Sequence, residues 1–174
     1  MVGAYIFFDC KYCFRPQKDV CNAIADCLPG CLRADKTSRV MALCTASQFQ
    51  SLTLFGASAL SFNTHSHTNL SFNVAAEQNH YAKNVTGLNV YEVVITYMHP
   101  GYNDEVNTLA WLPKAEEWSG RFLGAGGGGW VTGAENSTFA WAASEGFAFA
   151  TTDGGHAADS LVQDWALLRP GNVN

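Results

Sequence analysis

The sequence predicts an α/β protein built on a mixed β-sheet, and three observations support that class. Short apolar, β-branched segments recur between residues 90 and 153, each bounded by turn-forming residues. A short helical segment separates the last two, as in a β-α-β unit. The last segment is almost wholly apolar, which is typical of a parallel strand buried on both faces. Hydrophobic residues make up 48% of the 174 residues, enough to build a core.

Residues 1–43 differ from the rest of the chain in their cysteine content. Five cysteines lie there and a sixth follows directly: Cys10, Cys13, Cys21, Cys27, Cys31 and Cys44. Cys10 and Cys13 have the spacing of metal and redox pairs, but no second matched pair and no nearby His completes a tetrahedral site. We therefore expect no metal site, and a Cys-rich leader that is either unstructured or a misassigned start. The main domain is expected at residues 44–174.

The segment between the leader and the main sheet is predicted to be mostly surface structure. Residues 45–62 contain short apolar runs typical of peripheral strands, and residues 63–89 are rich in Asn, Ser, Thr and His, as surface loops are. His65 and His67 lie two positions apart in this predicted loop. Without a carboxylate partner they are expected to be solvated rather than to bind a metal.

Two strands, at residues 90–98 and 107–113, open the predicted main sheet. The intervening "HPGYND" has the composition of a tight turn, so the two strands should form a hairpin. "GRFLGAG", from Gly120 onward, begins a third strand, and residues 147–153 form a fourth. A sheet that ended after this fourth strand would have an unpaired apolar edge.

A short helix is predicted between the third and fourth strands. Asn136 or Ser137 is expected to cap its N-terminus, because a side-chain oxygen there can accept a bond from a free amide. Gly146 is expected to end the helix. The order hairpin, strand, loop, helix, strand is the opening of a mixed α/β sheet.

The loop before this helix is rich in glycine. Residues 120–129 contain six glycines, which lose more backbone freedom on folding than any other residue, and Trp130 follows. The free amides of such a loop and of the helix N-terminus can converge on an anion. One use is an oxyanion hole, which in α/β-hydrolases lies partly in the loop after the third strand. The position of the glycines fits that use.

Two other interpretations of the glycine loop stay open on spacing alone. Gly124-x-Gly126-x-x-Gly129 has the dinucleotide-binding spacing, and Asp153 lies at the end of the next strand, where a ribose-binding acid belongs. The preceding hairpin and the bulky Trp130 disfavour this interpretation. Alternatively, the glycines only allow the helix to pack closely on the sheet.

Charge and hydropathy exclude several partners. The net charge is −5 and charged residues make up only 14% of the chain, so neither nucleic acid nor an anionic membrane is an expected partner. The sequence has no run of about 18 apolar residues that would span a membrane. Glycosylation motifs begin at Asn69, Asn84 and Asn136 and favour a secreted protein. A convincing signal peptide is not evident.

A series of motifs extends from the hairpin to the C-terminus. They are "YMHPGYND", "WLP", the glycine-rich residues 118–129, "EGFAFATTDGGH", "WAL" and "PGNVN". In this order they resemble the tannase and feruloyl esterase family, mostly secreted carboxylic ester hydrolases of α/β-hydrolase fold. The resemblance covers roughly residues 44–174 and implies an incomplete α/β-hydrolase fold of about four core strands. The implied substrate is an ester of an aromatic or other carboxylic acid.

The resemblance also assigns roles to residues. It implies an oxyanion loop made of Gly126, Gly127, Gly128 and Gly129. Gly127 and Gly128 are the expected hydrogen-bond donors, and the other two glycines shape the loop. Asp153 and His156 are expected to support the pocket rather than to act in a catalytic triad.

The sequence departs from the family at its catalytic centre. It contains neither the family's Gly-Cys-Ser-x-Gly-Gly nucleophile motif nor any G-x-S-x-G, so no member of the triad is expected here. The cysteine expected just before Asn89 is replaced by Leu88, which leaves Cys44 without its implied partner. No cofactor is expected, because the family's calcium belongs to a lid that this sequence lacks. The alternatives to an esterase portion are a non-catalytic truncated module and, less favoured, a dinucleotide-binding domain.

Overall fold

The computed structural model describes residues 6–8, 56–76, 80–114, 116–127, 131–156, 160–169 and 172–173. The expectations for all six cysteines, for Gly128 and for Gly129 lie outside these residues. The main sheet has six strands in the order β1-β5-β6-β4-β3-β2. The strands are β1 (Ile6–Phe8), β2 (Ser58–Val74), β3 (Lys83–Met98), β4 (Val106–Pro113), β5 (Arg121–Gly124) and β6 (Phe147–Thr152).

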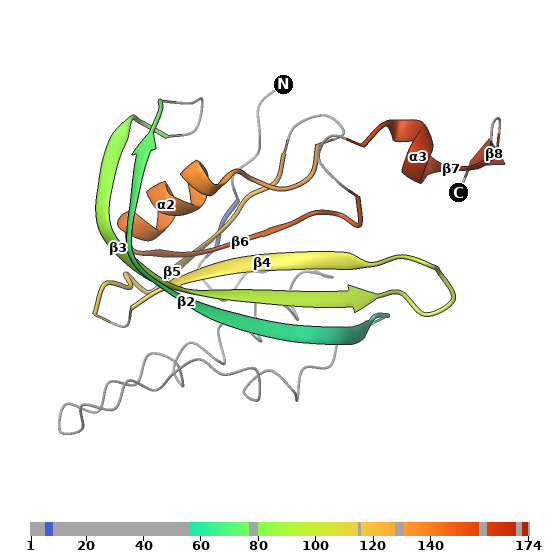
Figure 1. Cartoon of the computed structure of the whole chain (residues 1–174), viewed down its shortest axis with the longest axis horizontal. Coiled ribbons are helices and arrows are strands. Elements are labelled where there is room, and N and C mark those ends of the chain that lie inside the picture. The colour runs from blue at the N-terminus through green and yellow to red at the C-terminus, as the bar shows by residue number, and fades with distance from the viewer. Residues whose placement is uncertain are drawn as a thin grey trace.

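Helices and a small second sheet complete the described structure. Helix α2 (Asn136–Ser144) joins β5 to β6. Near the C-terminus, α3 (Val162–Ala166) leads into an antiparallel pair formed by β7 (Leu167–Arg169) and β8 (Asn172–Val173). This second sheet is separate from the six-stranded one (Figure 1).

The six-stranded sheet is mixed, as the sequence predicts. Strands β2, β3 and β4 form an antiparallel meander, and β4 is also antiparallel to β6. Strands β5 and β6 are parallel, and α2 makes the crossover between them. The long β2 and β3 bend around α2, so that the helix lies against the concave side of the sheet (Figure 1). The prediction of a mixed α/β sheet is confirmed.

The hairpin between β3 and β4 is confirmed together with its turn. Pro100 and Gly101 occupy the two central positions, and Gly101 has a φ of 93°. The amide of Tyr102 donates to the carbonyl of His99 over 3.0 Å, which closes the turn. A proline followed by a positive-φ glycine is the pattern of a type II turn. Outside the turn, the Asp104 carboxylate accepts from the His99 amide over 2.8 Å.

The predicted surface loop at residues 63–89 is wrong for most of its length. Residues 58–74 form β2, and β3 already begins at Lys83. Along β2, Leu70 and Phe72 pack against the hydrophobic core, whereas Asn69, Ser71 and Asn73, which alternate with them, are exposed. The Asn, Ser and Thr residues that suggested a loop therefore lie on the solvent face of an edge strand. Because polar and apolar residues alternate along such a strand, the apolar residues do not form a continuous run in the sequence.

Helix α2 ends where the sequence predicts but is capped differently. Its N-cap is Glu135, which makes no side-chain capping bond, so the prediction of Asn136 or Ser137 as cap is wrong. Gly146 ends the helix with a φ of 76°, and its amide donates to the carbonyl of Ala143 over 3.0 Å. A Cβ at Gly146 would lie 2.7 Å from the carbonyl oxygen of Glu117, which explains the glycine.

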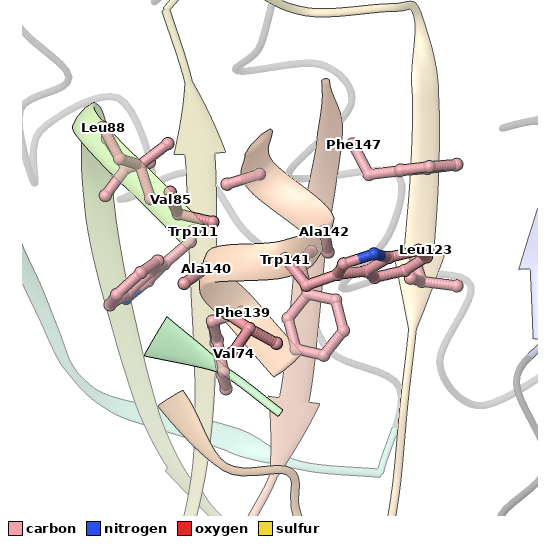
Figure 2. Packing of buried hydrophobic residues seen from close by; sticks show 13 residues of the cluster. Val74, Val85, Leu88, Trp111, Leu123, Phe139, Ala140, Trp141, Ala142 and Phe147 are labelled. Atoms are coloured by element: carbon pink, nitrogen blue, oxygen red, sulfur yellow. The ribbon is translucent and has the colours of Figure 1, made fainter. Parts of the chain in front are cut away.

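The hydrophobic core lies between α2 and the concave face of the sheet (Figure 2). The ring of Phe139 lies 4.4 Å from that of Phe149 on β6 and 5.3 Å from that of Trp111 on β4. The Trp141 ring stacks on Phe147 at 6.4 Å. The buried cluster comprises Val74, Val85, Leu88, Val90, Trp111, Leu123, Phe139, Ala140, Trp141, Ala142, Ala143, Phe147 and Phe149. Because this helix is apolar on nearly every side, the sheet has to wrap around it.

Part of the N-terminal leader belongs to the sheet. Residues Ile6–Phe8 run antiparallel to β5, with Phe7 opposite Leu123 and Phe8 opposite Phe122. Leu123 and Phe122 are themselves buried. The unpaired edge that the sequence suggests at the fourth predicted strand is wrong, because that strand, β6, pairs with β4 on one side and with β5 on the other. The outer side of β5 is in turn paired with the chain's own N-terminal strand β1.

Candidate functional site

A cleft of about 550 Å³ opens beside the carboxyl end of β6. Residues of β3 and β4 form its floor, and the segments 132–134 and 153–156 form its walls. Strand β6 is parallel to β5, so the cleft lies beyond the carboxyl ends of the parallel pair. Ligands of open α/β sheets bind at this end of the strands. We therefore take this cleft as the candidate site.

The carboxylate of Asp153 organises one wall of the cleft. Its Oδ1 accepts from the amides of Asn107 and Gly155, both over 2.9 Å. Its Oδ2 accepts from the Asn107 side-chain amide over 2.8 Å. Asn107 Oδ1 in turn accepts from the hydroxyl of Thr96 over 2.8 Å. These bonds join the ends of β3, β4 and β6 into one polar network, in which Asp153 acts as an acceptor for three donors.

Tyr97 follows Thr96, a member of this network, in strand β3. Burial raises the pKa of its hydroxyl above the usual 10.0, and the negative charges of Asp153 and Asp104 raise it further. The Tyr97 hydroxyl therefore stays protonated at neutral pH.

His156 lies at the other end of the segment 153–156, which also lines the cleft. Its amide donates to the carbonyl of Asp153 over 3.2 Å, and its ring stacks on Trp165 at 4.4 Å with an angle of 6°. Its Nδ1 is 3.4 Å from the hydroxyl of Ser160. The ring is thus held by packing on α3 while one edge faces the cleft lining.

The glycine loop begins as an extension of the parallel pair. The amide of Ala125 donates to the carbonyl of Ala150 over 3.1 Å, and the Thr151 hydroxyl donates to the carbonyl of Ala125 over 2.7 Å. Gly126 and Gly127 follow and are exposed. Within the described part of the chain, the amides of these two glycines donate to no backbone carbonyl. Among the described residues, nothing therefore occupies these two donors, as an anion-binding loop requires.

Gly127 is required by the close approach of the loop to itself. A Cβ at this position would lie 2.2 Å from the carbonyl oxygen of Val131, whereas a Cβ at Gly126 would meet nothing within 4 Å. Contact with helix α2 is therefore not what excludes a side chain at Gly127. Neither glycine lines the cleft. Gly127 thus combines a steric requirement with an amide that donates to no carbonyl among the described residues.

The returning limb of the loop rests on the end of β6. The hydroxyl of Thr132 donates to the carbonyl of Asp153. Gly133 has a φ of 89°, and a Cβ there would lie 3.2 Å from the carbonyl oxygen of Thr152. Thr132 and Asn107 are site residues that the sequence analysis missed. Asn107 could have been found from the sequence, because it is a polar residue at the start of the otherwise apolar strand β4.

The other residues singled out by the sequence lie away from the cleft. Asn69, Asn84 and Asn136 are exposed on β2, β3 and α2. None of the three belongs to the cleft lining.

Of the two histidines of β2, His65 is exposed, as expected, whereas His67 is only partly exposed. His67 Nε2 lies 3.3 Å from Glu92 Oε2, which also accepts from the Trp111 indole over 3.0 Å. His67 therefore does have a carboxylate partner, because β2 pairs with β3. The His65 ring lies 4.6 Å from that of His67. Within the described residues, no three His, Cys, Asp or Glu side chains are grouped so as to hold a metal ion.

The fold and the cleft define a class of protein. It is an α/β protein with a mixed sheet, in which a glycine-rich loop joins a strand to a helix and a cleft lies at the carboxyl ends of the parallel strands. No protein-family model matches the chain. The structure resembles that of "Tannin acyl hydrolase from Aspergillus niger" with a TM-score of 0.54 and 23% identity, over 75% of this chain and 22% of that chain. This likeness bears on the fold.

Comparison with the sequences of known proteins finds a relative that matches about half of the chain. Over 90 residues the chain is 41% identical to "Probable feruloyl esterase" of Arthroderma benhamiae, which is 51% of this chain and 17% of that protein. Over part of its length, the chain is therefore related to the tannase and feruloyl esterase family. The chain spans about a fifth of the length of these relatives. In the residues that the structure describes, no helix is long and apolar enough to cross a membrane.

Proposed function

We propose that the chain is an N-terminal portion of a secreted carboxylic ester hydrolase of the tannase and feruloyl esterase type, with an ester of an aromatic or other carboxylic acid as substrate. The observation that carries the proposal is the 41% identity to a probable feruloyl esterase over 90 residues. The fold of a tannin acyl hydrolase, found over 75% of the chain, supports it.

The chemistry of the whole enzyme would be that of a serine hydrolase. The oxygen of an activated serine forms a bond to the ester carbonyl carbon, the alcohol leaves with a proton, and water then releases the acid from the acyl-enzyme. The negative charge on the carbonyl oxygen is stabilised by preorganised amides. This chain contributes those amides in the proposal, and the nucleophile, acid and base come from elsewhere, because the sequence has no nucleophile motif.

The glycine loop is the proposed source of the oxyanion donors. It follows β5 and precedes α2, which is where the loop of an α/β-hydrolase oxyanion hole lies. The free amides of Gly126 and Gly127 support this assignment, which extends to Gly128 and Gly129. Asp153 and His156 support the neighbouring cleft wall through their hydrogen bonds and stacking.

A dinucleotide-binding domain is the alternative with a geometric argument of its own. Strand β5, the glycine loop, α2 and β6 do form a parallel β-α-β unit with Asp153 at its end. However, the Asp153 carboxylate already accepts three hydrogen bonds from Asn107 and Gly155. A ribose-binding acid needs its oxygens for the sugar hydroxyls. Protection of the chain against thermal unfolding by NAD would favour this alternative.

The experiment that tests the esterase proposal is a graft. Residues 83–156 replace the structurally matched segment of the Aspergillus niger tannin acyl hydrolase, and hydrolysis of a tannin ester is measured. We expect the graft to hydrolyse the ester. The isolated chain, assayed with methyl ferulate, should give no burst above buffer. A graft that folds and binds substrate but does not hydrolyse it would contradict the proposal, and would favour a non-catalytic module.

A further inference from the structure

Strand β2 is a long strand at the edge of the described sheet, and its sequence has few of the usual protections. It has 17 residues and lies at one end of the order of described strands. Residues 58–74 contain no Asp, Glu, Lys, Arg or Pro. Exposed edge strands pair with other chains unless charges, proline, bulges or a covering group prevent it. Three register shifts, after Ala59, after His67 and after Leu70, protect this strand only in part.

The outer face of the β2–β3 pair is polar and uncharged. On β2, Leu70, Phe72 and Val74 point to the core, so the exposed residues that alternate with them lie on the opposite face. On β3, Val85 is buried between exposed neighbours, and Asn73 lies directly opposite Asn84. We call this surface the outer polar face; it comprises Asn69, Ser71, Asn73, Asn84 and Thr86.

Two glycosylation motifs lie on this one face. In Asn69-Leu70-Ser71 and in Asn84-Val85-Thr86, both the asparagine and the hydroxyl residue are exposed, and the apolar residue between them points to the core. Asn69 sits at a bulge with a φ of 56°. The motif at Asn136 differs, because its Thr138 is buried in α2. The fold thus presents the first two motifs complete.

We propose that Asn69 and Asn84 carry N-linked glycans that shield the edge of β2 that pairs with no other described strand. In the reaction, the side-chain amide nitrogen forms a bond to the anomeric carbon of a lipid-pyrophosphate-linked oligosaccharide. The carbon–oxygen bond to the pyrophosphate breaks, the lipid pyrophosphate leaves, and the nitrogen loses one proton. A bulky, hydrated glycan on the edge strand and another on its neighbour keep a second chain from pairing there.

This inference rests on the secretory location in the proposed function, and its test is independent of esterase activity. The full chain is secreted from a eukaryotic host behind an added signal peptide, in an Asn136→Gln background. We expect endoglycosidase treatment to remove two glycans. Peptide mass spectrometry after amidase deglycosylation in water enriched in the heavy oxygen isotope should show a labelled aspartate at positions 69 and 84. Asn73→Gln, a change on the same face outside any motif, should retain both glycans. Absence of a glycan at either asparagine would overturn the proposal.

The shielding role has its own measurement. The mass of the Asn69→Gln/Asn84→Gln protein is compared with that of the glycosylated parent by size-exclusion chromatography with light scattering. We expect the unglycosylated variant to self-associate and the parent to remain monomeric. Thr68→Lys, which places a charge on the exposed side of β2, should restore the monomer in the unglycosylated variant. A monomeric double variant would contradict shielding, and association that Thr68→Lys leaves unchanged would place the contact elsewhere and overturn it too.

Discussion

At Gly127 a single missing side chain serves two purposes. The chain folds back on itself so closely that a Cβ would lie 2.2 Å from the carbonyl oxygen of Val131. The same absence leaves the Gly127 amide exposed and without a backbone acceptor in the described structure. Steric need and the proposed donor role can be separated by comparing Gly127 with Gly126, since both are exposed and only one is crowded.

Gly127→Ala is expected to destabilise the fold, whereas Gly126→Ala is not. Forcing a methyl group against fixed backbone costs about 1–3 kcal/mol. For a chain of this size, that corresponds to a fall in melting temperature of several degrees. Gly126→Ala should stay within about 0.5 kcal/mol of the parent, because open space surrounds the position. Equal melting temperatures of the two variants would show that the loop rearranges freely.

The Asp153 carboxylate is expected to contribute strongly to stability. Asp153→Asn replaces one acceptor oxygen by an NH2 donor. That donor would face either the backbone amides of Asn107 and Gly155 or the side-chain amide of Asn107. Hydrogen bonds to a charged group are worth about 1.5–3 kcal/mol each, so a loss of at least that size is expected in urea unfolding. Asp164→Asn is the control, since Asp164 is exposed and accepts one local bond from Leu161. A similar loss in both variants would contradict a special role of Asp153.

Glu145 should make stability depend on pH. Hydrogen bonds from Lys83 and Tyr81 lower the pKa of its carboxyl below the ordinary 4.5. The folded state therefore prefers the ionised form, so this contribution is complete above pH 4.5 and disappears as the pH falls through the lowered pKa. Glu145→Gln should reduce stability at neutral pH by less than about 1 kcal/mol and flatten the acid limb of the curve. Glu135→Gln is the control, because it removes a carboxylate that makes no capping bond. In this variant, stability should fall more steeply at acid pH than it does in Glu145→Gln.

At the scale of elements, α2 is the central packing unit. Phe139 is fully buried and contacts the rings of Phe149 on β6 and Trp111 on β4. Through it, one helix joins the antiparallel part of the sheet to the parallel pair. The helix lacks a side-chain N-cap and has no acidic residue in its first turn. Tertiary packing rather than local signals therefore holds it in place.

Phe139→Ala is expected to cost about 3–5 kcal/mol, the usual range for removing a buried phenylalanine. Because the cavity would separate α2 from both β4 and β6, near-ultraviolet circular dichroism of the tryptophans should weaken as well. Leu161→Ala is a matched control, since 59% of Leu161 is exposed. A loss below about 1 kcal/mol in Phe139→Ala would mean that α2 is not anchored by this ring.

Prediction from the sequence succeeded for elements whose signals are local. Strands β4, β5 and β6, the type II turn at Gly101 and the stop at Gly146 depend on a few neighbouring residues. Strand β2 was not predicted, because its exposed residues are polar and its more buried residues lie at alternate positions rather than in one apolar run. The partner of His67 was missed for the same reason, since Glu92 comes within reach of His67 only if β2 pairs with β3.

In the whole molecule, the cleft was the part that the sequence could only partly predict. Asp153 was located at the end of a strand, but its partner Asn107 lies 46 residues earlier and meets it only because β6 inserts beside β4. The returning limb at Thr132 depends in the same way on tertiary contact with Asp153. Spacing along the chain carries no information about a strand order of this kind.

Strand β1 has a consequence for how the sheet can grow. It runs antiparallel to β5, and so it occupies the hydrogen-bonding groups on the only free side of that strand among the described strands. Any parallel strand arriving there from another part of an enzyme would have to displace residues 6–8 first. In the proposed enzyme, the pairing of residues 6–8 with β5 would therefore have to open before a further strand could join the sheet on this side.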